Sequence, residues 1–572
     1  MVEKRRERRK LFWIAFGFVF IFTSPIFTNF TIFFETPRYE DAIMMGDYKR
    51  KIVGIDFDKG EFIYSRPRET KVLPFFSIIK EDFYYLLKIK IFGIEIPIIW
   101  RDYNGLFPFF PIIYIYNKIF SFLGEFWRWY VLKEVFYHFF FSFLFLYFLF
   151  KILERYFFID GFIVFSLIFC ALTTPTLYFI PREHHHAAVS FLILGMLYFL
   201  MEKRYVLAGV FGGLAVHNYL PIPYAICGLT LTSFLYHRNL KGVILVALLS
   251  TIFFAPSIYY IFSSLNQNFR LHYSCSNCII TLPSLEMVKP FFRGGIGSLY
   301  DLYKILGYVL ISLIFLPFKL PDILGIILSN LREAFSVSDI MSKYGFLSHS
   351  INSKYKNLTD LGITVNLLVL VLGIFYIRRR FEVAAYFFSL IFYALFSSYL
   401  SLLPKMIYVL LPIYLLISVR VINEFVLRKQ RILFLIFLIS CVLRLAEFID
   451  IMGKINPYSS WSKNREVVDF FKGKDVKSED ILLYCWPPAF KIFSNGKLDP
   501  MFFLPALDSL DPLLRKKTIE FIVNKSNFRY VVFYIGFIDY LKEILEEDRE
   551  NLKIVFNNRA FVILEIKRNS KK

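Results

Sequence analysis

Two short stretches of this 572-residue chain combine carboxylates with arginines. One reads Glu35-Thr-Pro-Arg38-Tyr-Glu40-Asp41 and follows an uncharged block at residues 11–34; the other holds Arg101 and Asp102 ahead of an aromatic, proline-containing segment. A carboxylate can accept a proton from an incoming nucleophile, and an arginine can bind a phosphate through paired N–H groups. The candidate acids are Glu35, Glu40, Asp41 and Asp102, and Arg38 and Arg101 are candidate phosphate-binding residues. Solvated charges that cap an interfacial helix are the alternative interpretation.

A third polar stretch, Pro181-Arg182-Glu183-His184-His185-His186, follows the apolar block at 161–180. Arg182 is the third candidate for phosphate binding. Glu183 and His184 are candidates for contact with the same ligand or with a divalent ion such as Mg²⁺ or Mn²⁺, and the need for a metal stays open. Adjacent histidines point in different directions on any regular element, so they do not by themselves predict a zinc site.

The composition decides which kind of molecule positions these residues. Hydrophobic residues make up 57% of the chain, charged residues only 20%, and the mean hydropathy is +0.53. A soluble chain needs about 25% charged residues, and it spaces apolar residues periodically rather than in long blocks. The sequence therefore excludes disordered, collagen-like and disulfide-rich classes and predicts a polytopic α-helical membrane protein.

The net charge of +21 would favour nucleic-acid binding in a soluble protein. Here the basic residues form short clusters at the ends of apolar blocks, as at Lys203-Arg204 and Arg378-Arg379-Arg380. Such clusters mark cytoplasmic loops and attract anionic lipid headgroups. We therefore expect membrane lipids as partners, no nucleic acid, and a cytoplasmic amino terminus.

A membrane pass needs about 20 apolar residues, and the basic clusters fix the direction of each pass. The uncharged stretch from 205 to 236 has basic clusters at both ends, which predicts two short passes that meet near His217, Asn218 and Pro221. Residues 303–335 allow two passes or a re-entrant pair, and parity favours two. The resulting thirteen passes are 11–34, 131–150, 161–180, 187–201, two within 205–236, 242–265, 303–318, 320–335, 362–377, 382–403, 405–419 and 432–448.

Two regions are predicted to lie outside the membrane. Within the membrane domain, 1–449, the segment 35–130 is predicted to form a long first outside loop, part of which we expect to form amphipathic surface helices. Residues 450–572 are predicted to form an extracytoplasmic α/β domain, with strands at 480–485, 528–534, 552–556 and 560–566 and a helix at 540–547. This domain shows no cluster of acid, base and nucleophile, so its expected role is stabilisation or recognition.

The remaining histidines and cysteines favour structural roles. His138 and His217 fall inside predicted passes and are expected to pack or to lie at helix ends. Cys170, Cys227 and Cys441 are expected to be buried in the membrane and inert. Cys275 and Cys278 lie in an outside loop, where a local disulfide and free thiols both remain possible.

The order of these segments resembles the GT-C superfamily of membrane glycosyltransferases, in particular its protein O-mannosyltransferase and aminoarabinose transferase branch. The motif Asp-Glu-x-Arg-Tyr of that branch corresponds to Glu35-Thr36-Pro37-Arg38-Tyr39, in which Thr36 replaces the second acid. Asn104-Gly105-Leu106 lies where the family has a proline-leucine turn. The proline and arginine at the outside end of the third pass correspond to Pro181-Arg182.

The resemblance implies an inverting glycosyltransferase that acts at the outer face of the membrane. Its donor would be a sugar linked to polyprenyl phosphate or diphosphate, either dolichyl or undecaprenyl, and its acceptor a lipid, a glycan or a protein. A carboxylate of the first outside loop would deprotonate or position the acceptor. The alternative is a non-enzymatic polyprenyl-lipid-binding protein or a lipid-sugar translocase, which predicts essential residues within the passes.

Overall fold

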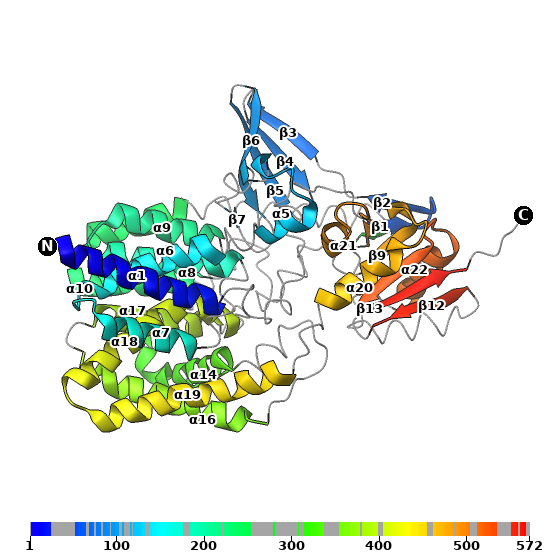
Figure 1. Cartoon of the computed structure of the whole chain (residues 1–572). Coiled ribbons are helices and arrows are strands. Elements are labelled where there is room, and N and C mark those ends of the chain that lie inside the picture. Colours follow the sequence, from blue (N-terminus) through cyan, green and yellow to red (C-terminus); the bar gives the residue numbers. More distant parts are fainter. Residues whose placement is uncertain are drawn as a thin grey trace, which may run out of the picture.

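The structure is a computed structural model, and it combines a helical bundle with two smaller β-containing parts (Figure 1). The bundle carries α1 at the amino terminus, and the parts built on strands lie toward its other end. The description covers residues 2–23, 52–64, 68–73, 76–81, 84–91, 93–101, 106–107, 115–116, 118–131, 138–174, 184–218, 222–252, 278–280, 307, 311, 314–336, 354–377, 380–397, 404–454, 461–484, 488–503, 512–534, 551–558 and 561–567.

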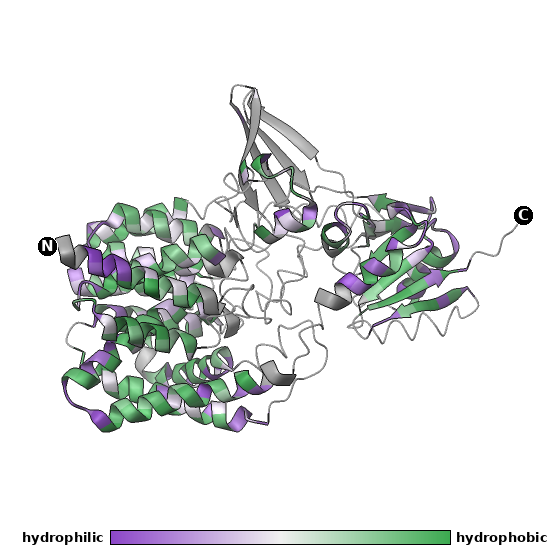
Figure 2. Ribbon diagram, viewed as in Figure 1, coloured by the Kyte–Doolittle hydropathy of each residue, from purple (hydrophilic) through white to green (hydrophobic). Residues whose placement is uncertain are grey.

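The bundle is built from the apolar blocks, and its helices are mostly hydrophobic along their length (Figure 2). Asp160 caps one of them, because its carboxylate accepts the N–H of Ile163 at 2.9 Å. The helices of the bundle include α1 (Val2–Thr23), α6 (Phe141–Leu153), α7 (Gly161–Leu172), α8 (His184–Met201), α9 (Tyr205–Asn218), α10 (Pro223–His237), α14 (Leu316–Phe335), α16 (Lys356–Ile374), α17 (Phe381–Ser397), the 3₁₀ helix η4 (Pro404–Leu410), α18 (Leu411–Leu427) and α19 (Arg431–Lys454).

Several of these helices have the properties of membrane spans. Among the described residues, Lys356–Ile374, Ile407–Leu427 and Arg431–Asp450 are long and apolar enough to cross a bilayer, and shorter apolar helices include Leu240–Ile252. Large apolar side chains also face outward, such as Phe318, Phe375 and Ile432, which are 81%, 70% and 75% exposed. Surfaces of this kind are rare in water and normal in lipid. The bundle is therefore that of a multi-pass membrane protein.

The two short passes predicted within 205–236 are confirmed as two helices, α9 and α10. Pro223 is the first residue of α10. A backbone N–H at that position has no acceptor within the helix, so the absence of an N–H in proline costs no hydrogen bond. The predicted pass at 320–335 corresponds to α14, but most of 303–318 lies outside the described residues. The number of thirteen passes therefore stays a prediction.

The prediction of amphipathic surface helices between residues 35 and 130 is wrong over 68–107. There the chain forms an antiparallel sheet in the order β3 (Arg68–Leu73), β4 (Phe76–Glu81), β5 (Tyr84–Ile91), β6 (Ile94–Arg101) and β7 (Leu106–Phe107). Alternation of polar and apolar residues, as in Lys88-Ile-Lys90-Ile91, has the period of a strand and explains the difference. Among the described residues of this segment, helix occurs near its end, at 115–116, 118–119 and in α5 (Glu125–Val131).

The segment that ends in α5 attaches the β-containing parts to the bundle. Trp129 is fully buried and Tyr116 nearly so, both in the core of the bundle. Burial raises the pKa of Tyr116 to about 12, so its hydroxyl stays protonated and donates to the carbonyl of Arg128 at 3.2 Å. Phe126 of α5 packs against the same core and also lies near Phe493, with ring centroids 6.2 Å apart.

The carboxyl-terminal part contains a five-stranded sheet in the order β10-β9-β11-β13-β12. All four strands predicted there are confirmed: β9 (Ile481–Tyr484), β11 (Tyr530–Tyr534), β12 (Leu552–Asn557) and β13 (Phe561–Ile566). β10 (Met501–Phe502) adds an edge. Helix α20 (Trp461–Lys472) packs with Leu483 and Val532, and α22 (Pro512–Asn524) packs with the alternate residues Leu482 and Val531, so the two helices cover opposite faces. The helix predicted at 540–547 lies outside the described residues.

This carboxyl-terminal part also takes in segments from the first outside loop and from a later one. The hairpin of β1 (Ile52–Asp56) and β2 (Glu61–Tyr64) pairs through β1 with β8 (Cys278–Ile280). Ile52 forms a parallel bridge to Phe503, and Ile52 and Ile55 are buried with α22. The predicted division into 1–449 and 450–572 therefore omits the contribution of residues 52–64 to the second unit.

Candidate functional site

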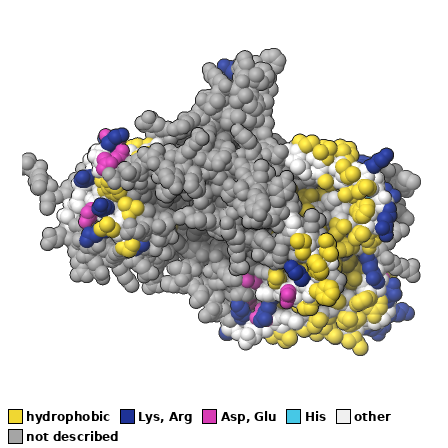
Figure 3. All heavy atoms as spheres, turned by 180° about the vertical axis from the view of Figure 1, so that it is seen from behind, with side chains coloured by type: hydrophobic (Ala, Val, Ile, Leu, Met, Phe, Trp, Pro, Cys, Tyr) yellow, Lys and Arg dark blue, Asp and Glu magenta, His cyan; other side chains and the backbone are white. Residues whose placement is uncertain are grey.

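The bundle has one end that carries most of its described basic residues, which we call the basic end (Arg8, Arg155, Lys203, Arg380 and Arg428). The guanidinium of Arg8 lies 5.5 Å from the ring centroid of Phe158, and Arg155 pairs with Glu202 at 3.2 Å. Figure 3 shows Lys and Arg side chains gathered along one edge of the bundle, beside a hydrophobic surface. This arrangement is expected where a membrane domain meets an anionic lipid surface.

We call the opposite end the domain end, because it faces the parts built on strands (Figure 1). The contact of Arg8 with Phe158 places the starts of α1 and α7 at the basic end, so both helices finish at the domain end. The Arg155–Glu202 pair places the ends of α6 and α8 at the basic end, so α8 begins with His184 at the domain end. β7, which pairs with Arg101 of β6 through Leu106, contacts α9.

The predicted site residues belong to segments that continue from these points. Arg101 is the last residue of β6 and His184 the first residue of α8, and only their backbone is described. The other candidates lie outside the described residues: Glu35, Arg38, Glu40, Asp41, Asp102, Arg182 and Glu183. Their segments follow the ends of α1, β6 and α7, which all lie toward the domain end. Individual catalytic and phosphate-binding roles therefore stay predictions.

A polar cluster that the sequence analysis missed lies inside the bundle near the domain end. We call it the Arg444 cluster (Asn366, Tyr414, Ser440, Cys441 and Arg444). Arg444 Nη1 donates to the Tyr414 hydroxyl at 2.7 Å, and the Tyr414 hydroxyl donates to Asn366 Oδ1. Asn366 Nδ2 donates to Ser440 Oγ at 3.0 Å and contacts Cys441 Sγ at 3.3 Å. The cluster therefore ties α16, α18 and α19 together.

Arg444 is a buried cation without a carboxylate partner among the described residues. Its side chain is 3% exposed, its Nη2 has only the weak acceptor Cys441 Sγ at 3.3 Å, and its Nε has no partner in the described part of the chain. Glu447 lies one turn further along α19, but Ser336 Oγ donates to its carboxylate at 3.3 Å. The Nε–H of Arg444 is therefore a hydrogen-bond donor without an acceptor in the described part of the chain, in apolar surroundings.

The depth of Arg444 can be estimated from the helix. With a rise of about 1.5 Å per residue, it lies about 20 Å along α19 from Arg431 at the basic end. The hydrocarbon core of a bilayer is about 30 Å thick. Arg444 therefore lies about two thirds of the way across the membrane from the basic end.

A second buried arginine lies toward the basic end, in what we call the Arg420 cluster (Tyr156, Glu382 and Arg420). Arg420 forms an ion pair with Glu382, and the two side chains are 3% and 0% exposed. The Tyr156 hydroxyl donates to Glu382 Oε2 at 2.8 Å, and its ring centroid lies 3.7 Å from the guanidinium carbon of Arg420. This cluster contains its own counter-charge.

Two carboxylates of the bundle were also not singled out from the sequence. Glu382 begins a helix next to Arg380, and Asp360 in α16 pairs with Arg332. These residues could have been identified from the sequence as charged residues within apolar blocks, as in Arg444-Leu-Ala-Glu447. His138, in contrast, is buried and its ring stacks on Phe20 at 4.6 Å, in agreement with the expected packing role. Cys170 and Cys441 are buried as expected, and Cys227 is partly so.

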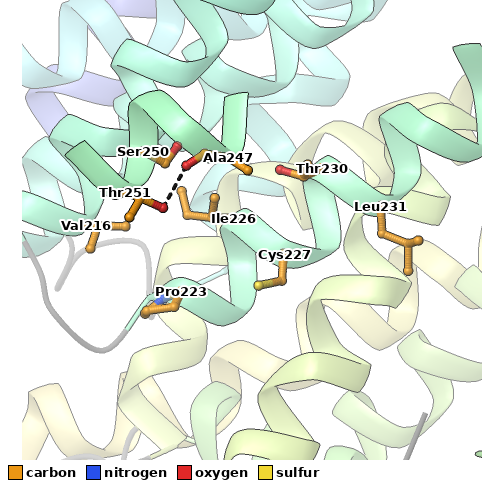
Figure 4. Close-up of a pocket in the computed structure, with 9 residues that line it drawn as sticks. All are labelled: Val216, Pro223, Ile226, Cys227, Thr230, Leu231, Ala247, Ser250 and Thr251. Atoms are coloured by element: carbon orange, nitrogen blue, oxygen red, sulfur yellow. Dashed lines mark hydrogen bonds between the residues drawn. The ribbon is translucent and has the colours of Figure 1, made fainter. Parts of the chain in front are cut away.

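A pocket of about 330 Å³ lies between α9, α10 and the helix Leu240–Ile252 (Figure 4). Two of its hydroxyls bond to backbone carbonyls: Thr251 to Ala247 at 2.8 Å and Ser250 to Gly209 at 3.4 Å. No charged side chain is present among the residues that line it, which are Val216, Pro223, Ile226, Cys227, Thr230, Leu231, Ala247, Ser250 and Thr251. The pocket suits a hydrocarbon chain rather than a headgroup.

Within the described part of the chain, no three histidine, cysteine, aspartate or glutamate side chains form a group that could hold a metal ion. Glu183 and the side chain of His184 fall outside that part, so the prediction of a divalent ion there is untested. Cys275 and the side chain of Cys278 also fall outside it, and their redox state stays open.

No protein-family model matches this chain, and no curated protein matches it. Among solved structures it is similar to ArnT from Cupriavidus metallidurans in the apo state, with a TM-score of 0.33 and 11% identity over 81% of this chain and 89% of that chain. It is also similar to the same protein bound to undecaprenyl phosphate, with a TM-score of 0.37 and 10% identity over 98% of both chains. The likeness is distant, so the chemistry of this chain has to be argued from its own residues.

Proposed function

We propose that this protein is a membrane glycosyltransferase that takes a sugar from a polyprenyl phosphate or diphosphate donor and transfers it to a lipid, glycan or protein acceptor outside the cytoplasm. The observation that carries the proposal is that α1, β6 and α7 end toward the same end of the bundle, and the candidate acids and arginines follow these elements in the sequence. Residues far apart in sequence can then act on one headgroup at the membrane surface.

The reaction we propose is a displacement at the anomeric carbon of the donor sugar. Glu35 takes the proton of the acceptor hydroxyl, the acceptor oxygen bonds to the anomeric carbon, and the bond from that carbon to the phosphate oxygen breaks. Negative charge develops on the leaving phosphate beside a low-dielectric membrane, so preorganised cations stabilise the transition state strongly. Arg38, Arg101 and Arg182 supply that charge, and Glu40, Asp41 and Asp102 are the other candidate acids.

The bundle supplies what a polyprenyl lipid requires. Its outward surface is apolar, and the pocket between α9, α10 and Leu240–Ile252 has walls suited to hydrocarbon. Such walls can accommodate a prenyl chain without exposing it to water. A lipid-linked donor therefore fits this chain better than a soluble nucleotide sugar.

The test is transfer by the purified protein from a panel of polyprenyl-linked sugars. A general base contributes about 10² to 10⁴-fold to the rate, so Glu35→Gln should lower transfer by that factor without changing donor affinity or thermal stability. Asp102→Asn should cost less transfer, or should weaken donor binding as well. Glu61→Gln, an exposed acid of β2, is the matched control and should transfer at the parental rate.

Parental transfer by Glu35→Gln would move the catalytic role to Glu40, Asp41 or Asp102. The same assay with a chelator decides the metal requirement, because loss of transfer that Mg²⁺ or Mn²⁺ restores would support a divalent ion near Glu183 and His184. Absence of transfer from every polyprenyl-linked sugar would overturn the proposed function.

A lipid-sugar translocase or a polyprenyl-lipid-binding protein is the second candidate. The observation that favours it is the presence of ionisable residues inside the passes, at Arg420, Glu382 and Arg444. A translocase would move a labelled lipid-linked sugar across proteoliposomes without consuming it. A transferase would consume the donor and release the polyprenyl phosphate.

A further inference from the structure

Arg444 poses an energetic problem that Arg420 does not. An ionised side chain in an apolar interior costs several kcal/mol unless an opposite charge or a set of hydrogen bonds compensates for it. Among the residues that the structure describes, the compensation for Arg444 consists of one tyrosine hydroxyl, one cysteine sulfur and the rings of Phe335 and Tyr414, each with its centroid 5.8 Å from the guanidinium carbon. Buried cations in membrane domains usually face a partner or a substrate path.

We propose that Arg444 is a phosphate-binding residue, and that its ligand is the phosphate of the lipid-linked sugar donor. The inference rests on the proposed function and extends its site from the surface segments into the bundle. The planar guanidinium presents N–H donors in a fork that matches two phosphate oxygens, and its unused Nε–H is available for one of them. Tyr414 and Asn366 fix the orientation of that fork through their bonds to Arg444 and to each other.

The position of Arg444 suits a headgroup that enters from the domain end. The cluster is next to Cys170, which lies close to the end of α7, where the segment that leads to Arg182 begins. A phosphate held there would place the polyprenyl chain within the membrane and the sugar toward the surface segments.

The site is closed in this structure. The ring centroid of Phe335, the last residue of α14, lies 5.8 Å from the guanidinium carbon of Arg444 and 4.8 Å from the ring centroid of Tyr414. α14 is a peripheral helix, with Phe318 and Leu328 81% and 56% exposed. Donor entry therefore requires a displacement of Phe335, for which the end of an outer helix is well placed.

The experiment measures binding by the full-length protein in nanodiscs of zwitterionic lipid. The probes are undecaprenyl phosphate, phosphatidylglycerol and inorganic phosphate. Wild-type protein should bind undecaprenyl phosphate, and Arg444→Met should weaken that affinity at least 10-fold. Arg444→Lys should give an intermediate loss, because lysine keeps the charge but not the fork. Arg428→Gln, which removes a positive charge from the basic end, is the matched control and should bind as the wild type does.

The outcomes separate the two proposals. Equal affinity of wild type, Arg444→Met and Arg444→Lys would overturn the role of Arg444 and leave the glycosyltransferase proposal standing. Absence of both undecaprenyl phosphate binding and sugar transfer in the wild type would overturn the proposed function and this inference with it. Equally tight binding of phosphatidylglycerol or inorganic phosphate at Arg444 would show a general anion site and overturn the donor assignment. Should Arg444→Met fail to fold, Arg444→Lys carries the test.

Discussion

The bundle buries an arginine toward each of its ends, and the surroundings of the two differ in one respect. Arg420 has Glu382 as an ion-pair partner and the ring of Tyr156 against its guanidinium. Arg444 is equally buried, but the described residues around it supply a hydroxyl, a thiol and aromatic rings rather than a carboxylate. Burial alone therefore does not reveal the purpose of a charge.

The difference separates a structural use of charge from a use that needs a ligand. A buried charge that forms an ion pair with a residue of the same chain joins helices, and its hydrogen-bonding groups are not free to bind a ligand. A charge without such a partner raises the free energy of the empty protein and lowers it again when an anion binds. Stability measurements on the empty protein can therefore distinguish the two arginines before any substrate is known.

The largest expected effect is a difference in stability between the two arginine variants. Arg420→Met leaves Glu382 as an unpaired buried carboxylate and should lower the free energy of unfolding by about 3–5 kcal/mol. Arg444→Met removes an unpaired cation and should leave that free energy unchanged or raise it. Reversible unfolding in detergent measures both.

The double variant Glu382→Leu/Arg420→Met serves as the control for the first prediction. It should recover most of the loss, because no charge is left without a partner. Equal destabilisation by Arg420→Met and Arg444→Met would show that the two clusters serve the same structural purpose.

A smaller effect is expected from Tyr156→Phe, which keeps the ring against Arg420 and removes the hydroxyl that donates to Glu382. A hydrogen bond to a charged group contributes about 1.5–3 kcal/mol, and the unfolding free energy should fall by that amount. Tyr147→Phe, at an exposed position of α6, should change it by less than about 0.5 kcal/mol. No difference between the two variants would argue against a tightly ordered Arg420 cluster.

A comparable effect on stability is expected from Tyr414→Phe in the Arg444 cluster. It removes the hydroxyl that accepts a hydrogen bond from the charged Arg444, so the free energy of unfolding should fall by about 1.5–3 kcal/mol. Undecaprenyl phosphate affinity should fall by less than 10-fold, because the fork of Arg444 remains but is less well oriented. The same nanodisc binding assay checks this, with Tyr376→Phe at the basic end as the control. A larger loss than that of Arg444→Met would make Tyr414 the principal phosphate contact.

Much of the fold could be predicted from the sequence where one-dimensional hydrophobicity decides structure. The blocks became helices, and the stretch 205–236 divided into α9 and α10 because it was too long for one pass and had basic residues at both ends. The strands β9, β11, β12 and β13 could be predicted because their apolar residues alternate between two buried faces. Polar and apolar residues also alternate in 84–91, which favours a strand and could have predicted the sheet β3–β7. The expectation of surface helices did not take this alternation into account.

The rest depends on contacts between distant segments. Neither Ile52 nor Phe503 carries a signal that identifies the other as its partner. The same holds for Asn366, Tyr414 and Arg444, which come together only when α16, α18 and α19 pack. The candidate acids Glu35 and Asp102 could be proposed from residue type and order, but residue type alone does not indicate which of them meets the donor.

The pairing of β1 with β8 and of Ile52 with Phe503 has a consequence for synthesis of the chain. Residue 52 emerges from the ribosome about 450 residues before its partner at 503, and at roughly 5–20 residues per second the delay is roughly 20–90 s. During that time the apolar side of the β1–β2 hairpin has no native cover, although the first helices are already being inserted. We expect nascent chains in this interval to depend on chaperones on the far side of the membrane, and chains that stop before residue 503 to be degraded rather than accumulate as a membrane domain alone.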